Sequence, residues 1–270
     1  MRRIPRFFLR WRAHARARRY TGVVHTLPAI PSPELGNQRP VLVYTPATYG
    51  AGDRRYPVIY MQDGQNLFDA AMSFAGDWGL RDALAWASRR GLDAIVVGIP
   101  NAGTARNAEY SPFEEPGAGG GSGDRYLEFV TRRVKPLIDA QFRTLTDRLN
   151  TGIAGSSMGG LISLYAFFRR PDVFGFTGVL SPSLWFANEA IFAVVEACPR
   201  VEGRVYLDVG VREGDRHVRL GRRMRDLLLD KGYLLRRNLR WVEDPDGTHH
   251  ESAWGRRFRK ALPFLLRNPG

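Results

Sequence analysis

Residues 155–160, "GSSMGG", lie where an apolar run gives way to a helical pattern, and the fold assignment starts from them. The preceding "NTGIA" is typical of a buried strand, and the following "LISLYAFF" is typical of a helix. Glycines on both sides of a serine indicate a turn that is too tight for side chains. Residues 155–159 also match G-x-S-x-G, which presents a nucleophilic serine between a strand and a helix.

The same residues have a second interpretation, in which glycine and serine only cap the start of a helix. The order of strand, motif and helix favours the nucleophile interpretation. It makes Ser157 the nucleophile and Ser156 the spacer beside it.

A serine nucleophile needs a general base, and three histidines follow Ser157 in the chain. His217 falls within a predicted helix among arginines, which disfavour an imidazolium, so we interpret it as a surface residue. His249 and His250 lie between the last predicted strand and the last predicted helix, where a general base is expected. Position alone does not choose between them.

The acid that orients the base should lie beyond a strand that precedes the histidine. The segment "YLDVGVREGD" (206–215) offers Asp208, Glu213 and Asp215. Asp208 lies within the strand and should point into the packing of the sheet. Glu213 lies three residues past Gly210, in the loop at the end of the strand, so we predict Glu213 in preference to Asp215.

Apolar periodicity predicts an α/β fold with a mostly parallel sheet and helices on both faces. Short runs rich in β-branched residues predict strands at 40–46, 56–62, 93–100, 151–156, 176–182, 204–210 and 239–244. Helical spacing predicts helices at 124–141, which Pro136 should kink, and at 216–230. The glycine-rich segment 116–124 does not match the dinucleotide fingerprint and is predicted to be a flexible loop.

The positive charge of the chain is concentrated at its start. Of a net charge of +13, eight positive charges are arginines within residues 1–19, which hold no acidic residue. We predict a basic arm at residues 1–20 and one domain at residues 21–270. The arm has two interpretations, weak contact with anionic surfaces or a poorly ordered or packed terminus, and neither implies a specific nucleic-acid partner.

Composition limits the class of protein. With 44% hydrophobic residues in a chain of 270, a sizeable core can form. The single cysteine, Cys198, excludes an internal disulfide. The start has no apolar export segment, and no run reaches the roughly 18–20 apolar residues of a membrane span. We therefore expect a soluble, cytoplasmic protein.

Four segments together resemble the putative esterase family of α/β-hydrolases, which includes esterase D, feruloyl esterases, siderophore esterases and mycolyltransferases. They are "YMQDGQNLFD" (60–69), residues 155–185 from "GSSMGG" to "SPSLW", "LDVGVREGD" (207–215) and "THHESAW" (248–254). The resemblance extends from about residue 21 to the C-terminus and implies the α/β-hydrolase fold.

The resemblance also chooses between the histidines. In that family the catalytic His is followed five residues later by Trp, and His249 and Trp254 have this spacing. His250 then stands where Asn is usual. The family's acid lies three residues after the glycine of "DVG", which again implies Glu213; many members have Asp there, and the mycolyltransferases have Glu.

A second implication concerns the oxyanion hole. Hydrolases of this fold form half of it from a His-Gly turn, which here reads "DGQN" (63–66), a variant that the similar esterases share. The expected donors are the backbone amides of Gln65 and Met158. Asp63 should point away and brace the loop, whereas Asn66 fits either role.

Substrate contacts are less defined by sequence. Arg106 and Tyr110 follow a strand on the expected catalytic side and would either bind an acyl group or fix their loop through Glu109 or Glu114. Trp185 is a candidate pocket wall, or else a core residue. We expect no metal and no cofactor, because the adjacent histidines lack the i, i+4 spacing of helical zinc ligands.

The sequence thus predicts a serine carboxylic-ester hydrolase that acts on a small-molecule ester through an acyl-enzyme intermediate. Two alternatives remain open at this stage: an acyltransferase with the same triad, or a non-catalytic binding protein on a hydrolase scaffold. The acyl and alcohol parts of the substrate, and the oligomeric state, are not determined by the sequence.

Overall fold

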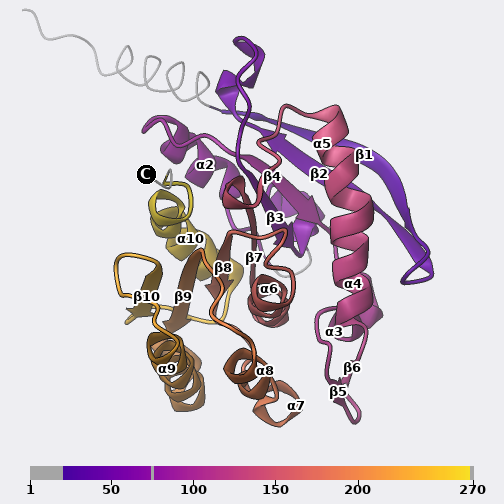
Figure 1. The fold of residues 1–270 in the computed structure, drawn as a ribbon. Helices are drawn as coiled ribbons and strands as arrows, with labels where there is room; N and C mark the ends of the chain where they lie inside the picture. Colours follow the sequence, from indigo (N-terminus) through magenta and orange to yellow (C-terminus); the bar gives the residue numbers. More distant parts are fainter. Residues whose placement is uncertain (1–20, 74–75, 268–270) are drawn as a thin grey trace, which may run out of the picture.

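The computed structural model describes residues 21–73 and 76–267, so the predicted basic arm lies outside the described residues. Its centre is an eight-stranded sheet in the order β1-β2-β4-β3-β7-β8-β9-β10 (Figure 1). The strands are β1 (Val23–Ser32), β2 (Asn37–Thr45), β3 (Val58–Gln62), β4 (Ile95–Ile99), β7 (Thr151–Ser156), β8 (Phe176–Leu180), β9 (Arg204–Gly210) and β10 (Leu239–Asp244). From β4 to β10 all neighbours pair in parallel, and β1 and β2 complete the sheet as antiparallel strands.

Helices cover both faces of the sheet, as predicted (Figure 1). The apolar side chains of α2 and α10 pack in one core, and those of α4, α6, α8 and α9 pack in the other. The α-helices are α2 (Leu80–Ser88), α3 (Arg106–Glu109), α4 (Gly123–Phe129), α5 (Lys135–Gln141), α6 (Met158–Arg169), α7 (Phe186–Glu189), α8 (Ile191–Ala197), α9 (Asp215–Asp230) and α10 (Glu251–Leu265). Across the described ranges, no helix combines the length and apolar character that a membrane crossing requires.

The parallel strands are apolar along their whole length because both of their faces are covered. In β3, Val58 and Tyr60 belong to one core, while Ile59 and Met61 belong to the other. All four side chains are almost fully inaccessible to solvent. This double burial explains why the strands read as continuous apolar runs in the sequence.

All seven predicted strands are present, but the sequence analysis missed β1. This strand lies at the edge of the sheet and contains Pro28 and Pro31. Its register with β2 shifts between Leu27 and Ile30. Proline cannot donate to a ladder, so it is tolerated at an edge or an irregularity but argues against a strand in the sequence alone.

Two further segments refine the predictions. The predicted helix at 124–141 is present, and its irregularity is a π-helical turn at Val130–Val134, just before Pro136. Such a turn accommodates a residue that has no N–H to donate. The prediction of a loop at 116–124 is wrong, because β5 (Glu114–Glu115) and β6 (Gly119–Gly120) pair as a small hairpin and α4 begins at Gly123.

Candidate active site

Ser157 occupies a sharp turn between β7 and α6. Its backbone has φ 57° and ψ −124°, a strained conformation for a residue with a side chain. A Cβ on Gly155 would lie 2.7 Å from Gln62 Oε1 and from the backbone of Gly159, so only glycine fits there. The N–H of Ser157 donates to the carbonyl of Leu180, at 3.1 Å, which ties the turn to β8.

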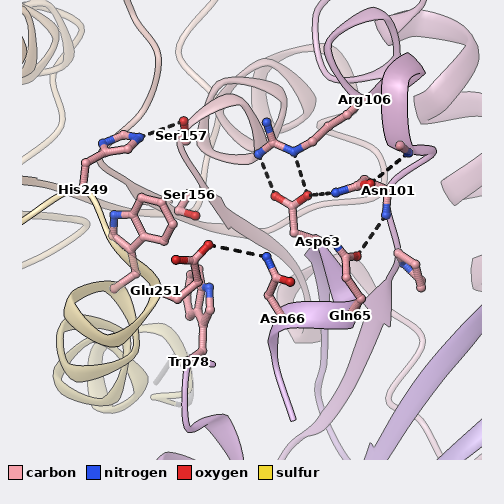
Figure 2. Close-up of a pocket in the computed structure, with 13 residues that line it drawn as sticks. Asp63, Gln65, Asn66, Trp78, Asn101, Arg106, Ser156, Ser157, His249 and Glu251 are labelled. Carbon is pink, nitrogen blue, oxygen red and sulfur yellow. Dashed lines mark hydrogen bonds and ion pairs between the residues drawn. The ribbon is translucent and has the colours of Figure 1, made fainter. Parts of the chain in front are cut away.

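The fold brings Ser157, His249 and Glu213 together at the carboxyl ends of three parallel strands. His249 Nδ1 lies 2.9 Å from Glu213 Oε2, and His249 Nε2 lies 3.0 Å from Ser157 Oγ. A carboxylate only accepts hydrogen bonds, so Nδ1 carries the proton and Nε2 is free to accept from the serine hydroxyl. Figure 2 shows the imidazole of His249 directed at Ser157.

His250 does not reach this group. Its Nδ1 accepts the backbone N–H of Ser252 at 3.2 Å and lies 3.0 Å from the hydroxyl of the same residue. His250 is therefore the N-cap of α10.

The Glu213 side chain is fully buried at the end of the short 3-10 helix η7 (Val211–Glu213). Its Oε1 accepts the backbone N–H of Gly210 at 2.9 Å and the hydroxyl of Ser181 at 2.5 Å. Burial alone would raise its pKa, but hydrogen bonds from His249 and Ser181 and the charge of Arg257 lower the pKa of Glu213 overall. This carboxyl is therefore held ionised opposite His249.

Asp208 lies beneath Glu213 and, as predicted, is a buried strand residue. It accepts the backbone N–H of Ser181 and the hydroxyl of Tyr206, at 3.1 and 2.9 Å. Burial raises the pKa of Asp208 to about 7, against the lowering effect of Arg257.

His217 differs from its interpretation as a surface residue. It is half-buried on α9, and its ring centroid lies 5.5 Å from that of His249. Burial is the main reason why the pKa of His217 is lowered. The potential ligand atoms of Glu213, His217 and His249 all lie within 4.8 Å of one another.

The two expected oxyanion donors lie at helix starts. Gln65 belongs to the 3-10 helix η2 (Gly64–Asn66), and Met158 is the first residue of α6. The first N–H groups of a helix have no intrahelical acceptor and are available to a ligand. Gly64 packs so closely on β4 that a Cβ would lie 2.5 Å from the backbone of Gly98. The chain before Gln65 is therefore held against the sheet.

Asp63 braces this loop, as the sequence analysis expected. Its carboxylate accepts two hydrogen bonds from Arg106, both 2.8 Å, and one from Asn101 at 2.7 Å (Figure 2). Arg106 thus fixes the loop through Asp63. The suggested partners Glu109 and Glu114 are wrong, because Glu109 forms a buried ion pair with Arg39 instead.

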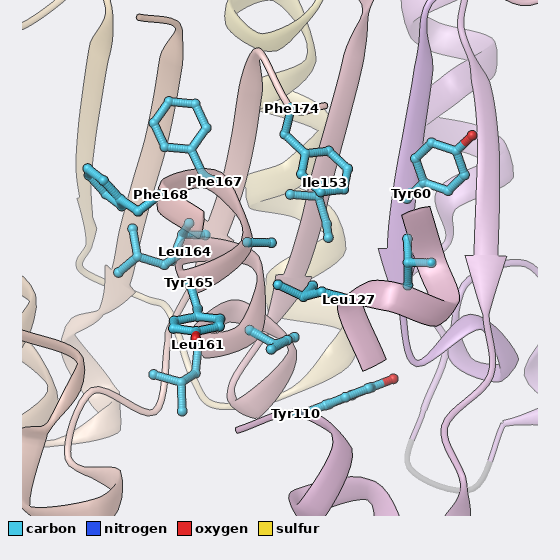
Figure 3. Close-up of a cluster of buried hydrophobic side chains, with 14 of the residues drawn as sticks. Tyr60, Tyr110, Leu127, Ile153, Leu161, Leu164, Tyr165, Phe167, Phe168 and Phe174 are labelled. Carbon is cyan, nitrogen blue, oxygen red and sulfur yellow. The ribbon is translucent and has the colours of Figure 1, made fainter. Parts of the chain in front are cut away.

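The three candidate substrate contacts have different positions. Arg106 lines the cavity beside Ser157, although Asp63 occupies its guanidinium. Tyr110 is fully buried among the core side chains in Figure 3, and its hydroxyl accepts the N–H of Asp63. Trp185 packs on Phe186, at a centroid distance of 6.0 Å, and is not among the residues that line the cavity.

The cavity has a volume of about 590 Å³ and reaches from Ser157 to the loops that follow β3 and β4. Trp78 and Trp254 form an aromatic wall with ring centroids 6.1 Å apart. Glu251 also lines it, and burial raises the pKa of this carboxyl. Glu251 Oε1 lies 3.5 Å from the amide nitrogen of Asn66.

Comparison with known proteins identifies the family of this chain. The family model described as "Putative esterase" matches residues 32–265. The chain belongs to this esterase family. The predictions of an α/β-hydrolase fold and of a carboxylic ester hydrolase are therefore confirmed.

This chain is also similar to the following three proteins. The Bacillus subtilis protein YbbA, described as uncharacterized, is 27% identical to this esterase over 243 residues, which are 85% of this chain and 93% of YbbA. A siderophore triacetylfusarinine C esterase of Aspergillus fumigatus is 32% identical over 147 residues, 52% of this chain and 49% of that enzyme. The crystal structure of BES protein from Bacillus cereus shares the fold, with a TM-score of 0.71 at 21% identity, over 91% of this chain and 95% of that one.

Three contacts in the esterase were not anticipated from its sequence. Ser183 Oγ lies 3.3 Å from Ser157 Oγ, Arg257 Nη2 lies 3.2 Å from Glu213 Oε1, and Glu251 lines the cavity. Arg257 had a visible signal, because it interrupts the apolar stripe of the last helix. Ser183 and Glu251 had none, since a serine in a loop and a glutamate at the start of a helix are usually solvated.

Proposed function

We propose that this esterase hydrolyses small carboxylic esters with Ser157 as nucleophile, His249 as general base and Glu213 as orienting acid. The observation that carries the proposal is the position of His249, whose two nitrogens lie 2.9 Å from Glu213 and 3.0 Å from Ser157. This is the geometry that activates a serine hydroxyl.

In the first half of the reaction, Ser157 Oγ attacks the ester carbonyl while His249 Nε2 takes its proton. The imidazolium then returns the proton to the departing alcohol, which leaves the acyl group on the serine. In the second half, His249 activates water in the same way, and hydrolysis of the acyl-enzyme restores Ser157. The Glu213 carboxylate stabilises the imidazolium in both halves.

The negative charge that develops on the carbonyl oxygen requires donors that are already in place. We assign this role to the backbone N–H groups of Gln65 and Met158, at the starts of η2 and α6. A carboxylate close to this point would oppose the reaction electrostatically. The ion pair of Asp63 with Arg106 cancels that charge and holds the loop in place.

The substrate class follows from the cavity and from a relative. A space of about 590 Å³ beside Ser157 accommodates a small ester, and its aromatic wall of Trp78 and Trp254 suits an apolar or aromatic group. The A. fumigatus relative carries the name of a siderophore esterase. We therefore propose small-molecule esters, with siderophore esters among those to be assayed.

The test is hydrolysis of p-nitrophenyl acetate by the wild type and by Ser157→Ala. Loss of the nucleophile should lower kcat by roughly 10⁴–10⁶-fold, as in other serine hydrolases. A fluorophosphonate probe should label Ser157 in the wild type, and mass spectrometry of the labelled peptide identifies the residue.

The paired histidines provide a matched control. His249→Asn should lose activity to a similar extent, whereas His250→Asn should retain it, because Asn is also a good N-cap residue for α10. Labelling of a different serine, or full activity in His249→Asn, would contradict the proposed mechanism.

A further inference from the structure

A half-buried histidine outside the proposed triad lies against the base. His217, the third residue of α9, stacks obliquely on His249, and its ligand nitrogen falls within 4.8 Å of the ligand atoms of Glu213 and His249. We propose that these three side chains bind a divalent transition-metal ion such as Zn²⁺, and that the bound ion inhibits the esterase.

The fold accounts for the cluster. Glu213 ends η7, directly after β9, and His217 follows four residues later, in the first turn of the next helix. His249 belongs to the loop after β10, which pairs in parallel with β9. The carboxyl ends of adjacent parallel strands meet at one edge of the sheet, so the two segments converge although they are far apart in the chain.

The donors match the chemistry of the proposed ion. Two imidazoles and one carboxylate form a ligand set that Zn²⁺ uses at sites with an open fourth position. Glu213 Oε1 is held by Gly210 and Ser181, while Oε2 faces His249. Outer hydrogen bonds of this kind orient metal ligands. Arg257 lies near Oε1, and its positive charge should keep the binding reversible.

Occupation of the site would remove the general base. A neutral imidazole has one unprotonated nitrogen. If the ion binds His249 Nδ1, the remaining proton sits on Nε2, which can no longer accept the proton of Ser157. If the ion binds Nε2, it occupies the same lone pair directly. Inhibition is therefore expected with either nitrogen.

The inhibition part of the proposal rests on the proposed function and is measured with p-nitrophenyl acetate. Rates in increasing Zn²⁺ are expressed as fractions of each variant's own rate in EDTA. His217→Phe keeps an aromatic ring beside His249 but removes a ligand, so its inhibition constant for Zn²⁺ should rise at least about tenfold. Mg²⁺ prefers oxygen ligands and should not inhibit the wild type.

Two variants control for other zinc ligands. Cys198→Ala and His250→Asn remove a free thiol and a neighbouring imidazole, and both should be inhibited by Zn²⁺ like the wild type. Equal inhibition of the wild type and His217→Phe would overturn the assignment of the site.

The binding part does not depend on ester turnover. Calorimetric titration of Ser157→Ala with Zn²⁺ should show one site, and adding His217→Phe should weaken it at least about tenfold. Absence of binding to Ser157→Ala would overturn the metal site. Absence of turnover in the wild type would instead contradict the proposed function and leave the calorimetric result to decide this inference.

Discussion

Two arginine–carboxylate pairs border the candidate site, and they are built differently. On the cavity side, Arg106 meets Asp63 in a one-to-one pair with two hydrogen bonds of 2.8 Å. Beneath Glu213, Arg257 is shared by two carboxylates, that of Glu213 at 3.2 Å and that of Asp208 at 3.5 Å. Among the described residues, Nε and Nη1 of Arg257 have no hydrogen-bond partner.

The two pairs differ in what they determine, the position of a loop in one case and the net charge of a buried group in the other. The Arg106 pair is bidentate and balanced, so it fixes the position of the Asp63 loop and leaves no net charge there. Arg257 is one fully buried cation beside two fully buried carboxylates, so that group cannot be neutral with both acids ionised. Burial is the main reason why the pKa of Asp208 is raised, whereas hydrogen bonds from His249 and Ser181 and the charge of Arg257 lower the pKa of Glu213. The first pair thus sets loop geometry, and the second sets the charge state of the acid.

The largest effect should come from removing Arg257. Arg257→Met leaves two buried carboxylates without a cation, and loss of one partner of a buried ion pair typically costs about 3–5 kcal/mol of unfolding free energy. Urea denaturation at pH 8 measures this change. The matched control Arg256→Met replaces an exposed neighbour and should change the free energy of unfolding by less than about 0.5 kcal/mol. Equal stability of the two variants would contradict the role given to Arg257.

A smaller effect, on turnover, is expected from the cavity-side pair. Arg106→Met leaves Asp63 charged near the expected oxyanion position and should lower kcat by about 10–100-fold. This is less than the largest losses of kcat seen when an oxyanion donor is removed. In an Asp63→Asn background, Arg106→Met should lower kcat much less, because no charge on residue 63 remains to be cancelled. A double-mutant cycle in kcat measures this coupling. Additive effects would show that Arg106 acts independently of Asp63.

A third effect, on the pH dependence of stability, is expected on replacing Asp208. Its pKa is raised from 3.8 to about 7, so the folded state holds the proton over this range while the unfolded state releases it. Its stabilising contribution is therefore fully present below about pH 3.8 and is lost as the pH rises to about 7. The stability of the wild type relative to Asp208→Asn should fall between pH 4 and 7 in urea denaturation. A constant difference over this range would contradict the raised pKa.

The sequence by itself determined the parallel part of the fold and the turn that carries the proposed nucleophile. Strands buried on both faces must be apolar throughout, and a serine between glycines after such a strand needs the tight turn that the structure shows at Ser157. The position of Glu213 was predictable for a similar reason, because the loop after a parallel strand lies at the same edge of the sheet as the turn at Ser157. The edge strand β1 was not, since its prolines favour a turn locally and only pairing with β2 makes it a strand.

Only the tertiary structure decided which side chains meet across these loops. His249 and His250 are adjacent and chemically identical, and from the residues alone neither was preferred; the backbone at the start of α10 directs one toward Ser157 and uses the other as a cap. Arg106 was matched to nearby acids in the sequence, yet it pairs with Asp63 from another strand end. In the same way, Arg257 of α10 reaches Glu213 after β9, and His217 of α9 lies close to His249 after β10. Local patterns fix secondary structure through backbone geometry, whereas these contacts join residues from separate strand ends and exist only once the sheet has brought the loops together.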